Sequence, residues 1–81
     1  MSTELRKWAR PWRVNEVMYE ARKRKLWTLQ KCADEVGLSV KHYTRIENGE
    51  RTTCLATYKR IADVLGVPLS EVLGEVFIDD L

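Results

Sequence analysis

The sequence predicts an all-α fold, a single domain of five short helices. Apolar residues recur every three or four positions in five separate stretches, which is the period of an amphipathic helix. Residues typical of helix starts and stops, Ser or Thr before a stretch and Gly after it, divide these stretches. The chain has 81 residues, 44% hydrophobic and 32% charged, which is ordinary for a globular protein. A chain of this length is short but can fold alone.

We divide the chain into a basic and aromatic arm (1–12), a helical domain (13–73) and an acidic, partly apolar tail (74–81). The first helix is expected to run from Arg13 to near Lys25, on a stripe of Val14, Val17, Met18 and Ala21.

The next two helices are joined by only three residues, "GLS". Thr28 is the expected N-cap of the second helix and Gly37 its stop, with the inward stripe Leu29, Cys32, Ala33 and Val36. Ser39 is the expected N-cap of the third helix. Two short helices joined so tightly must cross at a steep angle, which is the arrangement of a helix-turn-helix.

A polar loop over residues 49–54 precedes the fourth helix, whose stripe is Leu55, Tyr58, Ile61, Ala62 and Leu65. Gly66 is expected to end it, and Pro68 and Ser70 introduce a fifth helix through Leu73. The tail carries an apolar cluster of Val76, Phe77 and Ile78.

The net charge of +2 hides a strong asymmetry along the chain. Residues 1–25 carry a net charge of +5, residues 26–60 of +2 and residues 61–81 of −5. Such an asymmetry favours nucleic acid or an acidic surface as the partner. The alternative is that the basic residues form a solvated helix face.

Other function classes find little support in the composition. Two cysteines and one histidine, dispersed over residues 32–54, do not supply a four-ligand zinc site, so we expect no metal and no cofactor. Both Cys32 and Cys54 are expected to point inward as free thiols. No nucleophile–base set or pair of carboxylates converges, so an enzyme is not expected. No membrane span or secretory signal is evident, and a cytoplasmic protein is expected.

An ordered set of residues carries a resemblance to a known family. The set is Thr28, Ala33, Gly37-Leu38-Ser39, Ile46-Glu47-Asn48-Gly49, Ile61-Ala62-x-x-Leu65-Gly66-Val67 and Ser70-Glu71-Val72-Leu73. It resembles the lambda-repressor/Cro-like (XRE-type) helix-turn-helix regulators over about residues 14–73. The resemblance implies a lambda-repressor-like DNA-binding domain and a homodimeric repressor that reads double-stranded DNA at an inverted repeat, with no small-molecule ligand. The alternatives are an antitoxin or restriction-modification controller that binds DNA, or a protein-interaction adaptor on the same scaffold.

The resemblance makes residues 40–47 the recognition helix, whose N-terminal residues contact base edges in this docking mode. Val40, Lys41, Thr44 and Arg45 share one side of it, opposite Tyr43 and Ile46. Lys and Arg donate to guanine, Thr bonds either way, and Val contacts a thymine methyl group. The alternative is again a solvated face.

Further residues are expected at phosphates. Thr28 and Lys31 begin the second helix, where free N–H groups favour an anion. The other candidates, which lie in or beside the recognition helix, are Ser39, His42, Asn48, Arg51 and Thr52. Asn48-Gly49 can equally serve as a helix cap.

Three features remain. Arg6, Lys7, Arg10 and Arg13, interleaved with Trp8 and Trp12, form a possible DNA-binding arm; the alternative is that the tryptophans pack on the domain or across a dimer. By the resemblance, Arg22 and Glu47 form a structural ion pair. Leu26 stands where similar domains usually have Gly, so the end of the first helix is expected to be either extended or irregular.

Overall fold

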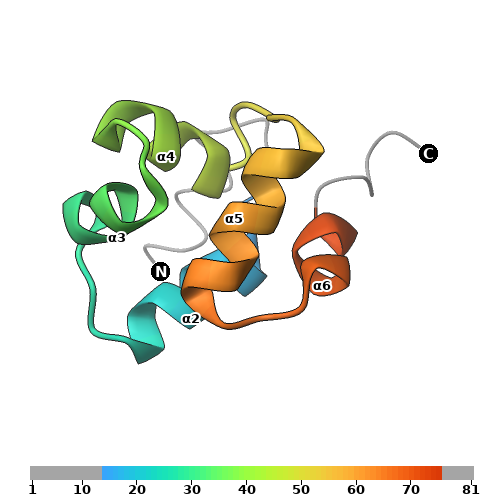
Figure 1. Cartoon of the computed structure of the whole chain (residues 1–81), viewed down its shortest axis with the longest axis horizontal. Helices are drawn as coiled ribbons and strands as arrows, with labels where there is room; N and C mark the ends of the chain where they lie inside the picture. The colour runs from blue at the N-terminus through green and yellow to red at the C-terminus, as the bar shows by residue number, and fades with distance from the viewer. Residues whose placement is uncertain (1–13, 76–81) are drawn as a thin grey trace, which may run out of the picture.

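The computed structural model describes residues 14–75, and within them it contains five helices and no strand, as predicted (Figure 1). The helices are α2 (Glu16–Arg24), α3 (Leu29–Val36), α4 (Val40–Glu47), α5 (Leu55–Leu65) and α6 (Leu69–Gly74). The predicted arm and the apolar cluster of the tail fall outside the described residues. Within residues 14–75, no helix is long and apolar enough to cross a membrane.

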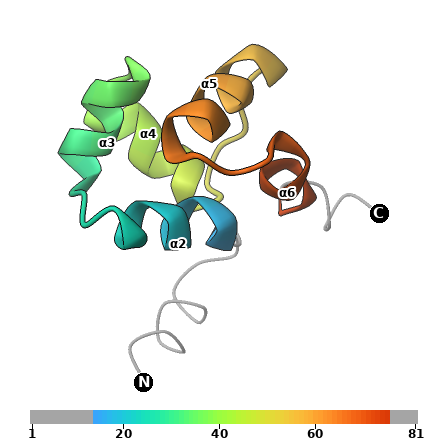
Figure 2. The same cartoon turned by 60° about the horizontal axis from the view of Figure 1, so that its bottom comes forward.

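The helices pack around one core. α3 packs chiefly on α4 and α5 on α6, while α2 contacts α4, α5 and α6. In Figure 2, α2 runs along one edge of the bundle, with α3 and α4 on one side and α6 near its opposite end. The apolar stripes meet in a core of Met18, Ala21, Cys32, Ala33, Val36, Tyr43, Ile46, Tyr58, Ile61, Ala62, Leu65 and Val72.

Side-chain caps and left-handed glycines set most helix ends where the sequence predicts them. The Thr28 hydroxyl accepts from the Lys31 N–H at 3.0 Å, and the Ser39 hydroxyl accepts from the His42 N–H at 3.1 Å. Gly37 and Gly66 end α3 and α5 with φ of 91° and 75°, a conformation that glycine adopts without steric cost.

The first helix begins later than predicted. Its N-cap is Asn15, whose side-chain oxygen accepts from the Met18 N–H at 3.1 Å, so the helix starts at Glu16 and not at Arg13. Val14 therefore precedes the helix. The fifth helix is capped by Pro68, which leaves Ser70 inside α6.

Two predictions at the start of α5 are wrong. Cys54 is exposed, not inward, and Leu55 is 60% exposed although the helical period places it on the apolar stripe. The start of α5 lies at the outer edge of the bundle (Figure 2). Both the Cys54 and the Leu55 side chains are exposed there. The Cys54 sulfur lies 3.3 Å from the Thr57 hydroxyl, and this hydrogen bond holds the pKa of Cys54 below its ordinary value. Cys32 is fully buried, as predicted, and burial raises the pKa of its thiol.

Of the two alternatives for the end of α2, the structure shows the irregular one, at Leu26. Leu26 adopts φ of 60°, the left-handed conformation, and is 91% exposed. Its N–H donates to the Lys23 carbonyl at 3.0 Å, and the Trp27 N–H donates to the Arg22 carbonyl at 3.2 Å. These are the hydrogen bonds of a left-handed helix cap, a position where glycine is usual. Leucine there costs about 1–2 kcal/mol in backbone sterics.

We predict that Leu26→Gly stabilises the domain by about 1 kcal/mol, because it relieves this strain and removes a side chain that is almost fully exposed. Thermal unfolding followed by circular dichroism measures the effect, expected as a rise in Tm of about 4–8 °C. Leu26→Ala is the control: it removes the same side chain but keeps a Cβ in the left-handed conformation, so its Tm should stay close to that of the wild type. Equal Tm values for all three proteins would contradict the prediction.

Candidate nucleic-acid interface

The turn between α3 and α4 fixes how α4 is presented. The N–H groups of Gly37 and Leu38 both donate to the Ala33 carbonyl, at 2.8 and 2.9 Å, and Ser39 then caps α4. Ala33 is fully buried, and its small side chain is consistent with the packing of α3 on α4. The structure thus contains the steep helix-turn-helix that the "GLS" connection predicts (Figure 1).

One face of α4 is buried and the other is open to solvent. Tyr43 and Ile46 lie in the core. Val40 is 37% exposed, Lys41 is exposed, and Thr44 and Arg45 are half-buried. The four side chains predicted for base readout are therefore available on the outer face. Their contacts with DNA stay a prediction.

Beside this face lies an open cavity of about 340 Å³. It is lined by Ser39, Lys41, His42, Arg45 and Arg51. Three of these five carry a permanent positive charge, and His42 adds an imidazole. The guanidinium of Arg45 is 3.8 Å from the Glu50 carboxylate, a half-exposed pair that is held weakly. The arrangement brings base-readout and phosphate candidates to one concave, cationic surface.

The other phosphate candidates are spread around this surface. Thr28 is exposed at the start of α3, but its hydroxyl already caps the helix. The Lys31 ammonium pairs with Glu35 at 2.9 Å and lies 5.8 Å from the centre of the Trp27 ring, so a phosphate would have to compete with both. Asn48 is the half-buried C-cap of α4, and Thr52 is exposed in the following loop.

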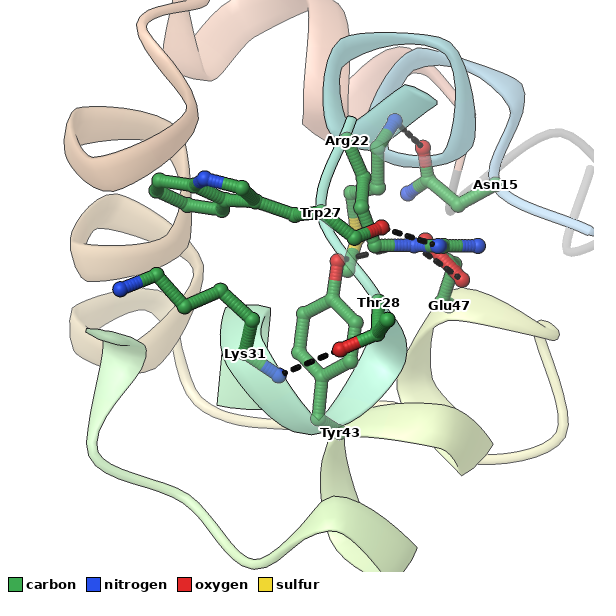
Figure 3. Close-up of polar contacts among 8 residues, drawn as sticks. Asn15, Arg22, Trp27, Thr28, Lys31, Tyr43 and Glu47 are labelled. Atoms are coloured by element: carbon green, nitrogen blue, oxygen red, sulfur yellow. Dashed lines mark hydrogen bonds and ion pairs between the residues drawn. The ribbon is translucent and has the colours of Figure 1, made fainter. Parts of the chain in front are cut away.

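A buried ion pair ties α4 to α2 (Figure 3). The Arg22 Nε lies 2.8 Å from a Glu47 carboxylate oxygen, and the side chains are only 10% and 3% exposed. Burial opposes the charged guanidinium, but the hydrogen bond and negative charge of Glu47 outweigh it, and the pKa of Arg22 is raised above its ordinary value. The Arg22 Nη1 also donates to the Trp27 carbonyl at 2.9 Å. The pair therefore anchors the chain on both sides of the α2–α3 connection.

Tyr43 completes the environment of this carboxylate. Its hydroxyl donates to Glu47 at 3.3 Å. Burial, and then the negative charge of Glu47, raise the pKa of Tyr43, which keeps the hydroxyl protonated as a donor. The buried side of α4 thus carries a polar network as well as apolar packing.

Asn15 is a structural residue that the sequence reasoning missed. It is 3% exposed, its N–H donates to the Glu47 carbonyl at 2.8 Å, and its side-chain amide donates to the Val72 carbonyl at 3.2 Å. One residue therefore joins the start of α2 to the end of α4 and to α6. Asn directly before Glu and an apolar stripe is a recognisable N-cap signal. Its two long-range hydrogen bonds have no local signature.

The described residues hold no group of three or more His, Cys, Asp or Glu placed to bind a metal ion. The candidate arm residues Arg6, Lys7, Arg10 and Arg13 lie outside the part of the chain that the structure describes.

Comparison with known proteins agrees with this geometry. Residues 18–72 match a family model described as helix-turn-helix. Since the match covers most of the chain, the protein belongs to the lambda-repressor/Cro-like (XRE-type) helix-turn-helix family. It is similar to the HTH-type transcriptional regulator AnsR of Bacillus subtilis (strain 168), with 36% identity over 55 residues. These residues are 68% of this chain and 47% of AnsR, so the chain spans about half the length of this curated relative.

We predict that Glu47→Gln or Arg22→Met lowers the free energy of unfolding by about 3–5 kcal/mol, because each leaves the other charge buried without its partner. Urea unfolding measures the loss. The double variant Arg22→Met/Glu47→Leu, which removes both charges, should recover a large part of it. As a control, Lys59→Ala breaks an exposed pair with Asp63 at 3.4 Å and should change the free energy by less than about 1 kcal/mol. Equal, small effects at the buried and exposed pairs would contradict the prediction.

Proposed function

We propose that this protein is a sequence-specific regulator of transcription that binds double-stranded DNA as a homodimeric repressor at an inverted repeat. The observation that carries the proposal is the outer face of α4, where Lys41, Thr44 and Arg45 are accessible beside a cavity with three cationic residues. Family membership supports DNA binding, and the similarity to the transcriptional regulator AnsR supports a role in transcription. A protein with this function works where the DNA is, which we propose to be the cytoplasm.

In the proposed complex, α4 enters the major groove and α3 crosses the phosphate backbone. Lys41 and Arg45 donate to guanine O6 and N7, Thr44 bonds to a base edge, and Val40 contacts a thymine methyl group. Arg51 and Thr52, which are exposed in the loop after α4, contact phosphates. Thr28 and Ser39, at the N-termini of α3 and α4, add contacts to DNA phosphates. Asn48, the C-cap of α4, donates to a further phosphate through its side-chain amide.

The dimer is proposed to form through the α5–α6 region. Leu55, at the edge of the bundle, offers an exposed apolar side chain in this region. A symmetric dimer places its two half-sites about one helical turn, or a multiple of it, apart. The operator is therefore expected to show two-fold symmetry.

Selection of binding sites from a random pool of double-stranded DNA, at about 150 mM salt, tests the proposal. Enrichment of a two-fold symmetric site is the expected result. Binding without enrichment, falling steeply with salt, would mean that the surface holds phosphates and reads no sequence. An absence of binding would overturn DNA binding and favour the protein-interaction adaptor.

We predict that Lys41→Ala and Arg45→Ala each weaken binding to the selected site roughly 5- to 150-fold, the value of one good base contact. Each should also relax the preference at one position of the half-site, which a repeated selection with the variant detects. Arg51→Ala should weaken binding to all sequences alike and reduce the salt dependence, as loss of a phosphate contact does.

Arg24→Ala is the matched control for these variants. It also removes one positive charge, but Arg24 borders a groove between α2 and α6 with Glu16, Glu20 and Glu71, outside the proposed interface. Its affinity and selected site should match those of the wild type. If Arg45→Ala and Lys41→Ala behave as this control does, base readout by α4 is wrong.

A further inference from the structure

His42 is the one histidine of the chain, and its place differs from that of the other candidate residues on α4. It is half-buried and lines the cationic cavity together with the cap residue Ser39 and with Arg45. Imidazole is the side chain whose charge ordinarily changes between about pH 5 and 8. The cavity therefore contains three fixed positive charges and one that depends on pH.

The charged groups around His42 come from few elements. Lys41 and Arg45 lie on α4 itself, and Arg51 comes from the loop after it. Glu50, from the same loop, is paired with Arg45. On α3, which packs against α4, Glu35 is paired with Lys31 and Asp34 accepts a hydrogen bond from Gln30. Lys41, Arg45 and Arg51 thus share the cavity with His42, and of the carboxylates named here Glu50 pairs with one of them, Arg45, through a weak contact of 3.8 Å.

A phosphate bound in the cavity would lie against His42, and its negative charge favours the protonated ring. Hydrogen bonding acts in the same direction: a phosphodiester oxygen only accepts, and the imidazolium offers two N–H donors where the neutral ring offers one.

We propose that DNA binding takes up a proton on His42, with a backbone phosphate in the cavity as its partner, so that the affinity for DNA rises as the pH falls. The inference rests on the proposed function and adds to it a dependence on pH located at one residue. No covalent step is involved: the proton comes from solvent, and the imidazolium and the phosphate meet as a charge-assisted hydrogen bond.

The first test is the affinity for the selected DNA site between about pH 5.5 and 8.5 at constant ionic strength, measured by fluorescence anisotropy with untagged protein. The phosphodiester does not titrate in this range. Uptake of one proton predicts that the affinity falls up to about tenfold for each unit of rising pH where the imidazole is neutral in the free protein. His42→Gln, which keeps a donor but gains no charge, should show a flat profile. His42→Lys, with a permanent charge, should also be flat, but should bind more tightly than His42→Gln at high pH.

The second test observes the proton directly. Since the chain has a single histidine, its imidazole Cε1–H signal in an NMR spectrum is unambiguous. At about pH 7.5 the protonated fraction of His42 should increase when the DNA is added. Calorimetric titration in buffers of different ionisation enthalpy should show net proton uptake by the wild type and a smaller uptake, or none, by His42→Gln.

The outcomes separate the two proposals. Binding that is independent of pH in the wild type, or that keeps the same pH dependence in His42→Gln, would overturn this inference and leave the proposed function intact. Absence of binding at every pH would overturn the proposed function and this inference together.

Discussion

The buried carboxylate of Glu47 is the group on which the presentation of α4 depends. α4 is only eight residues long, and one of its faces is open to solvent, so its orientation must come from the buried face. There the Glu47 side chain binds Arg22 and accepts from Tyr43, while its backbone carbonyl accepts from Asn15. Apolar contacts alone would hold α4 in the core without fixing its rotation, whereas directional hydrogen bonds favour one arrangement. The hydrogen bonds on the buried face of α4 therefore determine the orientation of its outer face.

The charged pairs of this domain differ in what they contribute. The exposed pairs within α3 and α5 lie in high dielectric and add little to stability. The buried pair between α2 and α4 links two helices. Removal of one partner is strongly destabilising, because the other charge is left buried without compensation. Lys41 and Arg51, which have no carboxylate partner among residues 14–75, instead lie at the cavity beside α4. Whether a charged side chain is buried or exposed therefore distinguishes the structural ion pair from the candidate DNA-binding residues.

The sequence predicted the elements well because their signals are local. Caps such as Thr28, Ser39 and Gly37 act within a few residues, and they set helix ends that the structure retains. Features that depend on tertiary placement were missed: the period of α5 does not reveal that Leu55 lies beyond the edge of the core, and no local pattern connects Asn15 with Glu47 and Val72. The exposed side of α4 followed from its period, but the cavity could not be predicted, because the path of the loop that carries Arg51 has no periodic signal.

Asn15 also bears on how the domain folds. Its hydrogen bonds span 32 residues to Glu47 and 57 residues to Val72, so they close only when distant parts of the chain have come together. If α6 frayed alone, the Asn15 side-chain amide would lose its acceptor. If α2 detached, the Glu47 and Val72 carbonyls would lose their donor. Each buried group left without a hydrogen bond costs about 1–3 kcal/mol. Partly open states are thereby disfavoured relative to both the native and the fully unfolded chain. The first and last described helices are coupled through one side chain, which promotes all-or-none unfolding of the five helices.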